Sequence, residues 1–121
     1  MFTIIFPVLN ERLRLESGVT RTVEYLHKIA FEDYEIIIVD NGSEDETPQI
    51  AEALCQKYDK VRYERINVRG VGAAFRRGVE VSHGDVVGYM DIDLSTNIRH
   101  LGEAIHLFET QPEIQYINGS R

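Results

Sequence analysis

The chain has 121 residues, of which 43% are hydrophobic and 27% charged, and its formal net charge is -7 at pH 7. This composition is ordinary for a globular protein, and the length suits one domain with a modest core. The acidic balance argues against a nucleic-acid or anionic-lipid surface, and no apolar run reaches the roughly 18 to 20 residues of a membrane helix. We therefore expect a cytoplasmic chain without a transmembrane segment.

Strands and helices alternate from the first residues onward. The unbroken apolar run Phe2 to Val8 predicts a strand buried on both faces, with Pro7 near its end, where a missing N–H is tolerable. Apolar residues at helical spacing then predict a helix over Val19 to Ile29, preceded by an irregular segment over 12–18. A second strand is expected over Glu35 to Val39.

A second helix is expected to begin where Thr47 precedes Pro48, because proline at the first helical position gives up only an N–H that would lack a partner. Its predicted buried stripe consists of Ile50, Ala53, Leu54 and Tyr58. The single cysteine, Cys55, falls on the apolar side of this helix, so we expect it to be buried and inert. A short third strand over Val61 to Ile66 follows.

The second half of the chain repeats the alternation. After a glycine-punctuated turn we expect a third helix in which Gly78 allows close packing, with an apolar stripe of Val71, Phe75 and Val79. A fourth strand over Asp85 to Met90, a fourth helix with the stripe Ile98, Leu101, Ile105 and Phe108, and a fifth strand over Ile114 to Ile117 complete the pattern. Such alternation predicts an α/β fold with a doubly wound, mainly parallel sheet and helices on both faces.

The ends of the predicted strands carry a set of polar side chains: Asn10, Glu11, Asp40, Asp91 and Asp93. Ligands bind at the carboxyl ends of the strands in doubly wound sheets. Two carboxylates spaced as Asp91 and Asp93 leave a strand on the same face, and such a pair suits Mg²⁺ or Mn²⁺ that also holds substrate phosphates. The same pair also fits a solvated loop that caps the next helix, so both interpretations stay open at this point.

The loop after the second strand is rich in polar residues. It is not an EF-hand, because Asp45 stands at the sixth position, where glycine is required. Ser43, Asp45 and Thr47 fit an Asx-type turn that caps the second helix. We expect Asp40 to lie outside this turn and to accept hydrogen bonds from a base or sugar, and Asn10 to cap the helix or loop that follows it.

A second loop contains Gly70 and Gly72, which let the backbone approach a ligand, next to Arg69, which can neutralise phosphate charge. A dinucleotide fingerprint is excluded because its sixth position holds phenylalanine, and no Gly-Lys-Ser/Thr triplet supports a P-loop.

Four segments in register closely resemble the family 2 glycosyltransferases: Phe6 to Glu11, Ile38 to Thr47, Arg69 to Gly72 and Asp91 to Thr96. The resemblance spans nearly the whole chain and is closest to the polyprenyl-phosphate (dolichyl-phosphate) mannosyl- and glucosyltransferases. It implies a GT-A fold whose N-terminal half binds a UDP- or GDP-sugar together with Mg²⁺ or Mn²⁺, and sugar transfer with inversion. Residues 1–121 would then form a single nucleotide-sugar-binding domain, truncated before the acceptor half.

The resemblance also implies roles for individual residues. By matching position, the nucleotide-sugar pocket would be lined by Pro7, Asn10, Glu11, Asp40, Gly70, Gly72 and Asp91. Asp93 would ligate the metal, with Asp91 in the ribose or metal region. Arg121, in the segment Gly119 to Arg121, would meet a phosphate, as would Arg69. No catalytic base can be named from the sequence.

Other function classes stay open. A nucleotide-sugar-binding or regulatory module without turnover is the nearest alternative, and a metal-dependent nucleotidyltransferase is third. A polyprenyl-phosphate acceptor would place the site at a membrane surface, with the chain peripheral to it. No nucleic-acid partner is expected, and an apolar edge beyond Ile117 would favour a homo-oligomer.

Overall fold

The computed structural model of the protein describes residues 1–67, 70–90, 92, 101–103, 105–106 and 116–118. Its middle layer is a five-stranded sheet in the order β3-β2-β1-β4-β5, in which every neighbouring pair is parallel. The strands are β1 (Phe2–Val8), β2 (Tyr34–Asp40), β3 (Val61–Arg65), β4 (Val86–Tyr89) and β5 (Tyr116–Asn118). The predicted doubly wound parallel sheet is confirmed.

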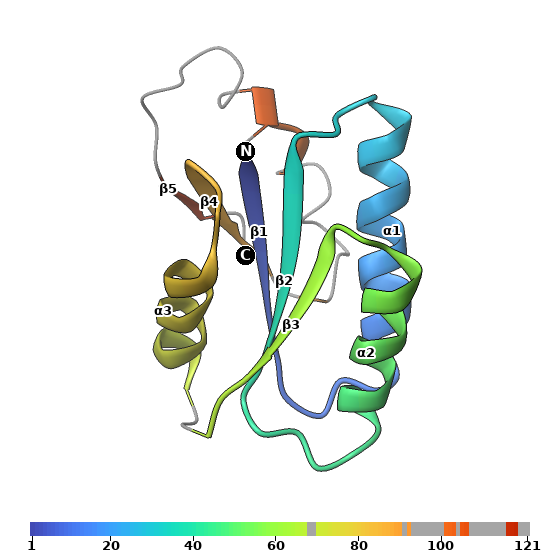
Figure 1. Cartoon of the computed structure of the whole chain (residues 1–121), viewed down its shortest axis with the longest axis vertical. Helices are drawn as coiled ribbons and strands as arrows, with labels where there is room; N and C mark the ends of the chain where they lie inside the picture. The colour runs from blue at the N-terminus through green and yellow to red at the C-terminus, as the bar shows by residue number, and fades with distance from the viewer. Residues whose placement is uncertain (68–69, 91, 93–100, 104, 107–115, 119–121) are drawn as a thin grey trace.

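Helices cover both faces of this sheet. Helices α1 (Leu15–Lys28) and α2 (Thr47–Lys57) lie on one face and α3 (Val71–Val81) lies on the other (Figure 1). The chain moves outward from β1 through β2 to β3, then crosses back so that β4 lies on the other side of β1. The strand order therefore reverses beside β1, and the crevice at the carboxyl ends there is the usual ligand position in such sheets.

The two faces of the sheet contribute to separate apolar cores. Ile4 and Phe6 of β1 belong to the core shared with α1 and α2, whereas Ile5 belongs to the core shared with α3, and all three are fully buried. This alternation follows from the two-residue period of a strand. Burial on both faces explains the unbroken apolar run of β1, whose bounds match the prediction.

Helix α1 begins at Leu15, so the prediction of an irregular segment up to residue 18 is wrong over its last turn. Gly18 inside this turn weakens the helical signal, since glycine costs about 1 kcal/mol relative to alanine in a helix. Packing outweighs that cost. Leu15 and Val19 are fully buried, and a Cβ on Gly18 would lie 2.7 Å from the carbonyl oxygen of Ile92.

Helix α2 begins at Thr47 with Pro48 in its first turn, as predicted. The predicted stripe is wrong at Ala53, which is exposed, while Ala51 is buried. Cys55 is half-buried against the core, and burial, with a smaller effect of Glu52, raises the pKa of its thiol. The predicted full burial of Cys55 is therefore found only in part, while the raised pKa keeps its thiol protonated at neutral pH.

Helix α3 packs on the sheet through its small residues. Ala74 is fully buried, and a Cβ on Gly78 would collide with the side chain of Ile5, which confirms the predicted close packing. Val79 was expected on the buried stripe but is 41% exposed. The helix is rotated so that Gly78, one residue earlier, faces the sheet.

The end of the chain is described only in part. Leu101 and Ile105 have helical backbone and are buried, as predicted, whereas Ile98 and Phe108 lie outside the described residues. Strand β5 is present, although Ile114, its predicted start, is also outside them. Among the helices described, none is long and apolar enough to cross a membrane.

The amino ends of the strands are joined by the buried carboxylate of Glu35. It accepts hydrogen bonds from the Thr3 hydroxyl at 2.7 Å, the Arg62 guanidinium at 2.8 Å and the His83 backbone N–H at 2.5 Å. Burial alone would raise the pKa of Glu35, but these donors together lower it below the ordinary value. The carboxylate therefore ties β1 to β3 and to the turn before β4.

Glu35→Gln should lower the free energy of unfolding at about pH 7 by about 1–3 kcal/mol, because an amide leaves donors unsatisfied. A lowered pKa in the folded state gives stability that is present above the unfolded value and lost as the pH falls through the folded value. The difference between wild type and variant should therefore shrink below about pH 4.5, the ordinary value. Urea unfolding from about pH 7 to about pH 3 measures it, with exposed Glu52→Gln as the control. A difference independent of pH would contradict this role.

Candidate functional site

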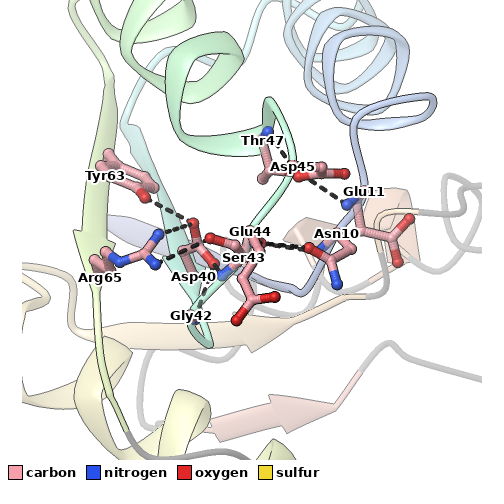
Figure 2. Close-up of polar contacts among 10 residues, drawn as sticks. All are labelled: Asn10, Glu11, Asp40, Gly42, Ser43, Glu44, Asp45, Thr47, Tyr63 and Arg65. Carbon is pink, nitrogen blue, oxygen red and sulfur yellow. Dashed lines mark hydrogen bonds and ion pairs between the residues drawn. The ribbon is translucent and has the colours of Figure 1, made fainter.

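The carboxylate of Asp40 ends β2 and is fully buried. Its Oδ1 accepts the backbone N–H groups of Gly42 at 3.1 Å and Ser43 at 2.7 Å. Its Oδ2 accepts the Tyr63 hydroxyl at 2.7 Å and the Arg65 guanidinium at 3.3 Å (Figure 2). Four donors thus surround one carboxylate. The expectation that Asp40 lies outside the turn is wrong, because two of these donors belong to the turn itself.

The two partners of Asp40 on β3, Tyr63 and Arg65, both act as hydrogen-bond donors. Burial and the bond to Asp40 raise the pKa of Tyr63 to about 12, so its hydroxyl stays protonated. Arg65 also donates to the backbone carbonyl of Ser43 at 2.9 Å, although 42% of its side chain is exposed. Gly42, with a φ of 92°, takes the left-handed conformation that brings the turn back onto the carboxylate. These hydrogen bonds therefore join the end of β2, the turn that follows it and β3.

The loop after β1 is joined to the loop after β2 by hydrogen bonds of Asn10 and Glu11 (Figure 2). The Asn10 N–H donates to the Ser43 hydroxyl at 2.8 Å, and the Asn10 side-chain carbonyl accepts the Glu44 N–H at 2.9 Å. The Glu11 N–H donates to the Thr47 hydroxyl at 2.9 Å. Asn10 therefore caps the neighbouring loop, not the helix or loop that follows it. Its φ of 54° is a left-handed value that asparagine tolerates.

Asp45 completes the contact between the two loops. Its carboxylate accepts the Thr47 N–H at 2.9 Å, which is the predicted Asx-type turn before α2, and also the Arg12 N–H at 3.3 Å. Beside these contacts lies a cavity of about 250 Å³ lined by residues 10–14 and Asp45. These hydrogen bonds hold the loops after β1 and β2 against each other at the carboxyl ends of two neighbouring strands.

The structure places the predicted site residues as far as it describes them. Asn10, Glu11 and Asp40 are joined through the two loops, and Pro7 lies on β1 in register with Val39. Gly70, with a φ of 123°, precedes α3, and a Cβ on it or on Gly72 would meet nothing within 4 Å. Four of the predicted site residues lie outside the described part of the chain: Arg69, Asp91, Asp93 and Arg121. Among the residues that are described, no group of three or more metal-ligating side chains is present.

Ile92, between the two predicted metal ligands, is described and buried in the core shared with α1 and α2. A Cβ on Gly18 of α1 would lie 2.7 Å from its carbonyl oxygen and 2.8 Å from its Cδ1. The absence of a side chain at Gly18 therefore allows Ile92 to pack on the helix. The sequence did not single out Gly18, although a glycine within a helical pattern was the available signal.

Comparison with known proteins gives a match over residues 3–118 to the model of glycosyl transferase family 2. The glycosyltransferase AglD of Haloferax volcanii is 37% identical over 105 residues, which cover 85% of this chain and 17% of AglD. The dolichyl-phosphate beta-glucosyltransferase of Mus musculus is 40% identical over 101 residues, which cover 78% of this chain and 31% of that protein. The chain thus spans less than a third of the length of either relative.

Solved structures show the same fold. S. aureus TarS 1-349 in complex with UDP superposes with a TM-score of 0.69 at 23% identity, over 92% of this chain and 32% of that one. The mannosyltransferase PcManGT of Pyrobaculum calidifontis, in complex with GDP-Man and Mn²⁺, gives 0.68 at 19% identity, over 88% and 32%. The predicted GT-A fold is confirmed.

Gly18→Ala should destabilise the protein by about 1–3 kcal/mol, because the new methyl group overpacks against Ile92 by more than the gain in helix propensity. Gly72→Ala in α3 is the matched control, since its Cβ meets open space and should be neutral or stabilising. Urea unfolding measures both. Equal effects of the two substitutions would show that close packing of Ile92 on α1 does not limit stability at Gly18.

Tyr63→Phe should lower the free energy of unfolding by about 1–2 kcal/mol, because Asp40 loses a donor inside the protein. Tyr58→Phe, at a residue that packs on the same core, is the control and should have a smaller effect. Thermal unfolding at neutral pH compares them, and an unchanged Tyr63→Phe variant would contradict the bridging role of Asp40.

Proposed function

The chain belongs to glycosyl transferase family 2, and we propose that it is the donor-binding part of an inverting glycosyltransferase that uses a nucleotide-diphospho-sugar and a divalent metal. The observation that carries the proposal is the pair of interlocked loops after β1 and β2. They hold Asn10, Glu11 and Asp40 together at the carboxyl end of the sheet, beside the reversal of strand order. Ligands of doubly wound sheets bind there.

We place the nucleoside against the end of β1 and the loop after β2, near Pro7, Asn10, Glu11 and Asp40. The Asp40 carboxylate already accepts four hydrogen bonds, so a ligand reaches it only if one donor gives way. Arg65 makes the longest of the four bonds to Asp40 and is partly exposed, and its second bond, to the Ser43 carbonyl, would let it stay on the turn if a ligand took its place at Asp40. The main role of Asp40 in this proposal is therefore to hold the turn that borders the pocket.

We assign the metal to Asp91 and Asp93, whose hard oxygen atoms suit Mg²⁺ or Mn²⁺. Ile92, which lies between them in the sequence, is buried against Gly18 of α1, and this contact supports the assignment. A bound divalent ion would neutralise negative charge on the departing nucleoside diphosphate. PcManGT was solved with both GDP-Man and Mn²⁺. Arg69 and Arg121 are proposed as additional phosphate contacts, and Gly70 and Gly72 let the start of α3 approach the nucleotide.

For the complete enzyme we propose a polyprenyl-phosphate acceptor at a membrane surface, because curated relatives are dolichyl-phosphate glycosyltransferases. The phosphate oxygen of such an acceptor is already anionic, so its direct attack on the anomeric carbon needs no strong general base. Attack on the face opposite the leaving diphosphate inverts that carbon.

A binding module without turnover is the second candidate, favoured by the short span of the chain relative to its relatives. Transfer assays with a nucleotide-sugar and a polyprenyl phosphate separate it from an enzyme. A nucleotidyltransferase ranks third, and competition between UTP and UDP-glucose distinguishes it.

Strand β5 lies at an edge of the described sheet, where we propose that copies of the chain can associate.

Calorimetric titration with UDP and with GDP, each with and without Mn²⁺, tests the proposal. We expect one nucleotide to bind about 10-fold more tightly with the metal, and Asp93→Asn to lose that gain because an amide is a weaker ligand for a hard cation. Glu103→Gln, at an exposed helical residue, is the control and should bind as wild type does. Binding that ignores the metal, or an Asp93→Asn variant equal to wild type, would refute the metal assignment.

A further inference from the structure

The carboxylate of Asp40 is covered by hydrogen-bond donors of the chain itself. It is fully buried, and each of its two oxygen atoms accepts two hydrogen bonds. An ionised carboxylate accepts roughly four hydrogen bonds when its lone pairs are fully used. A nucleoside placed beside the turn must therefore displace one of these four donors before it can bond to Asp40.

Three of the four donors are held in place by the backbone or by packing. The N–H groups of Gly42 and Ser43 belong to the turn, where Gly42 has a φ of 92°. The Tyr63 hydroxyl is carried by a ring that is partly buried against the core shared with α1 and α2. None of these donors can leave the carboxylate unless the turn or the core rearranges.

Arg65 is the exception among the four. Its Nη1 lies 3.3 Å from Asp40 Oδ2, and 42% of its side chain is exposed. Its Nη2 donates to the Ser43 carbonyl at 2.9 Å, and this bond does not involve the carboxylate. Arginine has many rotamers, so its side chain can turn away from Asp40 while the backbone of β3 stays in place.

A second anion lies near Arg65. A hydrogen bond with Tyr63 and the charges of Asp40 and Glu44 raise the pKa of the Arg65 guanidinium. The contribution of Glu44, which is exposed on the same turn, shows that its carboxylate is within electrostatic range of Arg65. A guanidinium released from Asp40 therefore keeps a negative charge and a backbone carbonyl close by.

We propose that Arg65 is an autoinhibitory contact, which occupies Asp40 until a nucleotide binds and an N–H or O–H group of the nucleoside takes its place. The inference rests on the proposed function, because it needs a nucleotide beside the turn. Nucleotide then binds only the fraction of molecules in which Arg65 has released the carboxylate, and the apparent affinity is reduced by that fraction. Removal of the guanidinium should strengthen binding, whereas attraction between arginine and an anionic nucleotide predicts the opposite.

The test compares wild type with Arg65→Met and with Arg21→Met, a control that removes the same charge from an exposed position on α1. Calorimetry and stopped-flow mixing in excess Mn²⁺ measure the affinity and association rate for UDP and for GDP. If Arg65 is released in roughly 10 to 30% of molecules, Arg65→Met should bind the preferred nucleotide about 3- to 10-fold more tightly and associate faster. Arg21→Met should bind as wild type does or slightly more weakly, because it only removes positive charge.

Arg65→Lys decides the matter if Arg65→Met does not fold. Lysine keeps the charge but lacks the planar fork that bonds to Asp40 and Ser43 together, so this variant should also bind more tightly than wild type, by a smaller factor.

Unchanged or weaker binding by the variant that folds would overturn the inference and leave the proposed function intact, since Arg65 would then not compete with the nucleotide. Failure of both variants to fold would overturn it too, because the contact would be structural. Failure of wild type to bind either nucleotide would overturn the proposed function, and the inference with it.

Discussion

The buried carboxylate of Asp40 is the interaction on which this end of the molecule depends. A charge removed from water must be surrounded by donors, and Asp40 finds four in its own turn and on β3. The turn that it fixes presents Ser43 and Thr47, whose hydroxyls accept the N–H groups of Asn10 and Glu11. One carboxylate therefore sets the relative positions of two strands and two loops.

Burial of the sheet on both faces concentrates the chemistry at the strand ends. The interior positions of β1 and β2 are occupied almost entirely by apolar side chains that fill the two cores. Polar groups meet at the two ends of the strands, around Glu35 at the amino ends and around Asp40 at the carboxyl ends. The strand order reverses beside β1, and the carboxyl ends there are the usual ligand position in such sheets. Ile92, the residue between Asp91 and Asp93 in the sequence, packs against Gly18 of α1 as part of the same core.

Local signals in the sequence predicted the fold well. The apolar run of β1 and the Thr47-Pro48 start of α2 need no distant partner, and both were found where expected. The start of α1 was missed because Gly18 follows a tertiary contact and not helix propensity. Tyr63 and Arg65 were missed because their role exists only once β3 lies in register beside β2.

A crystal structure of the chain with Mn²⁺ and the nucleotide that it binds would test the assignment of the donor site most directly. The nucleotide should lie at the carboxyl ends of β1 and β2, beside Asn10, Glu11 and Asp40, with the cation on Asp91 and Asp93. A nucleotide bound at the amino ends of the strands, or a cation held by other side chains, would contradict it.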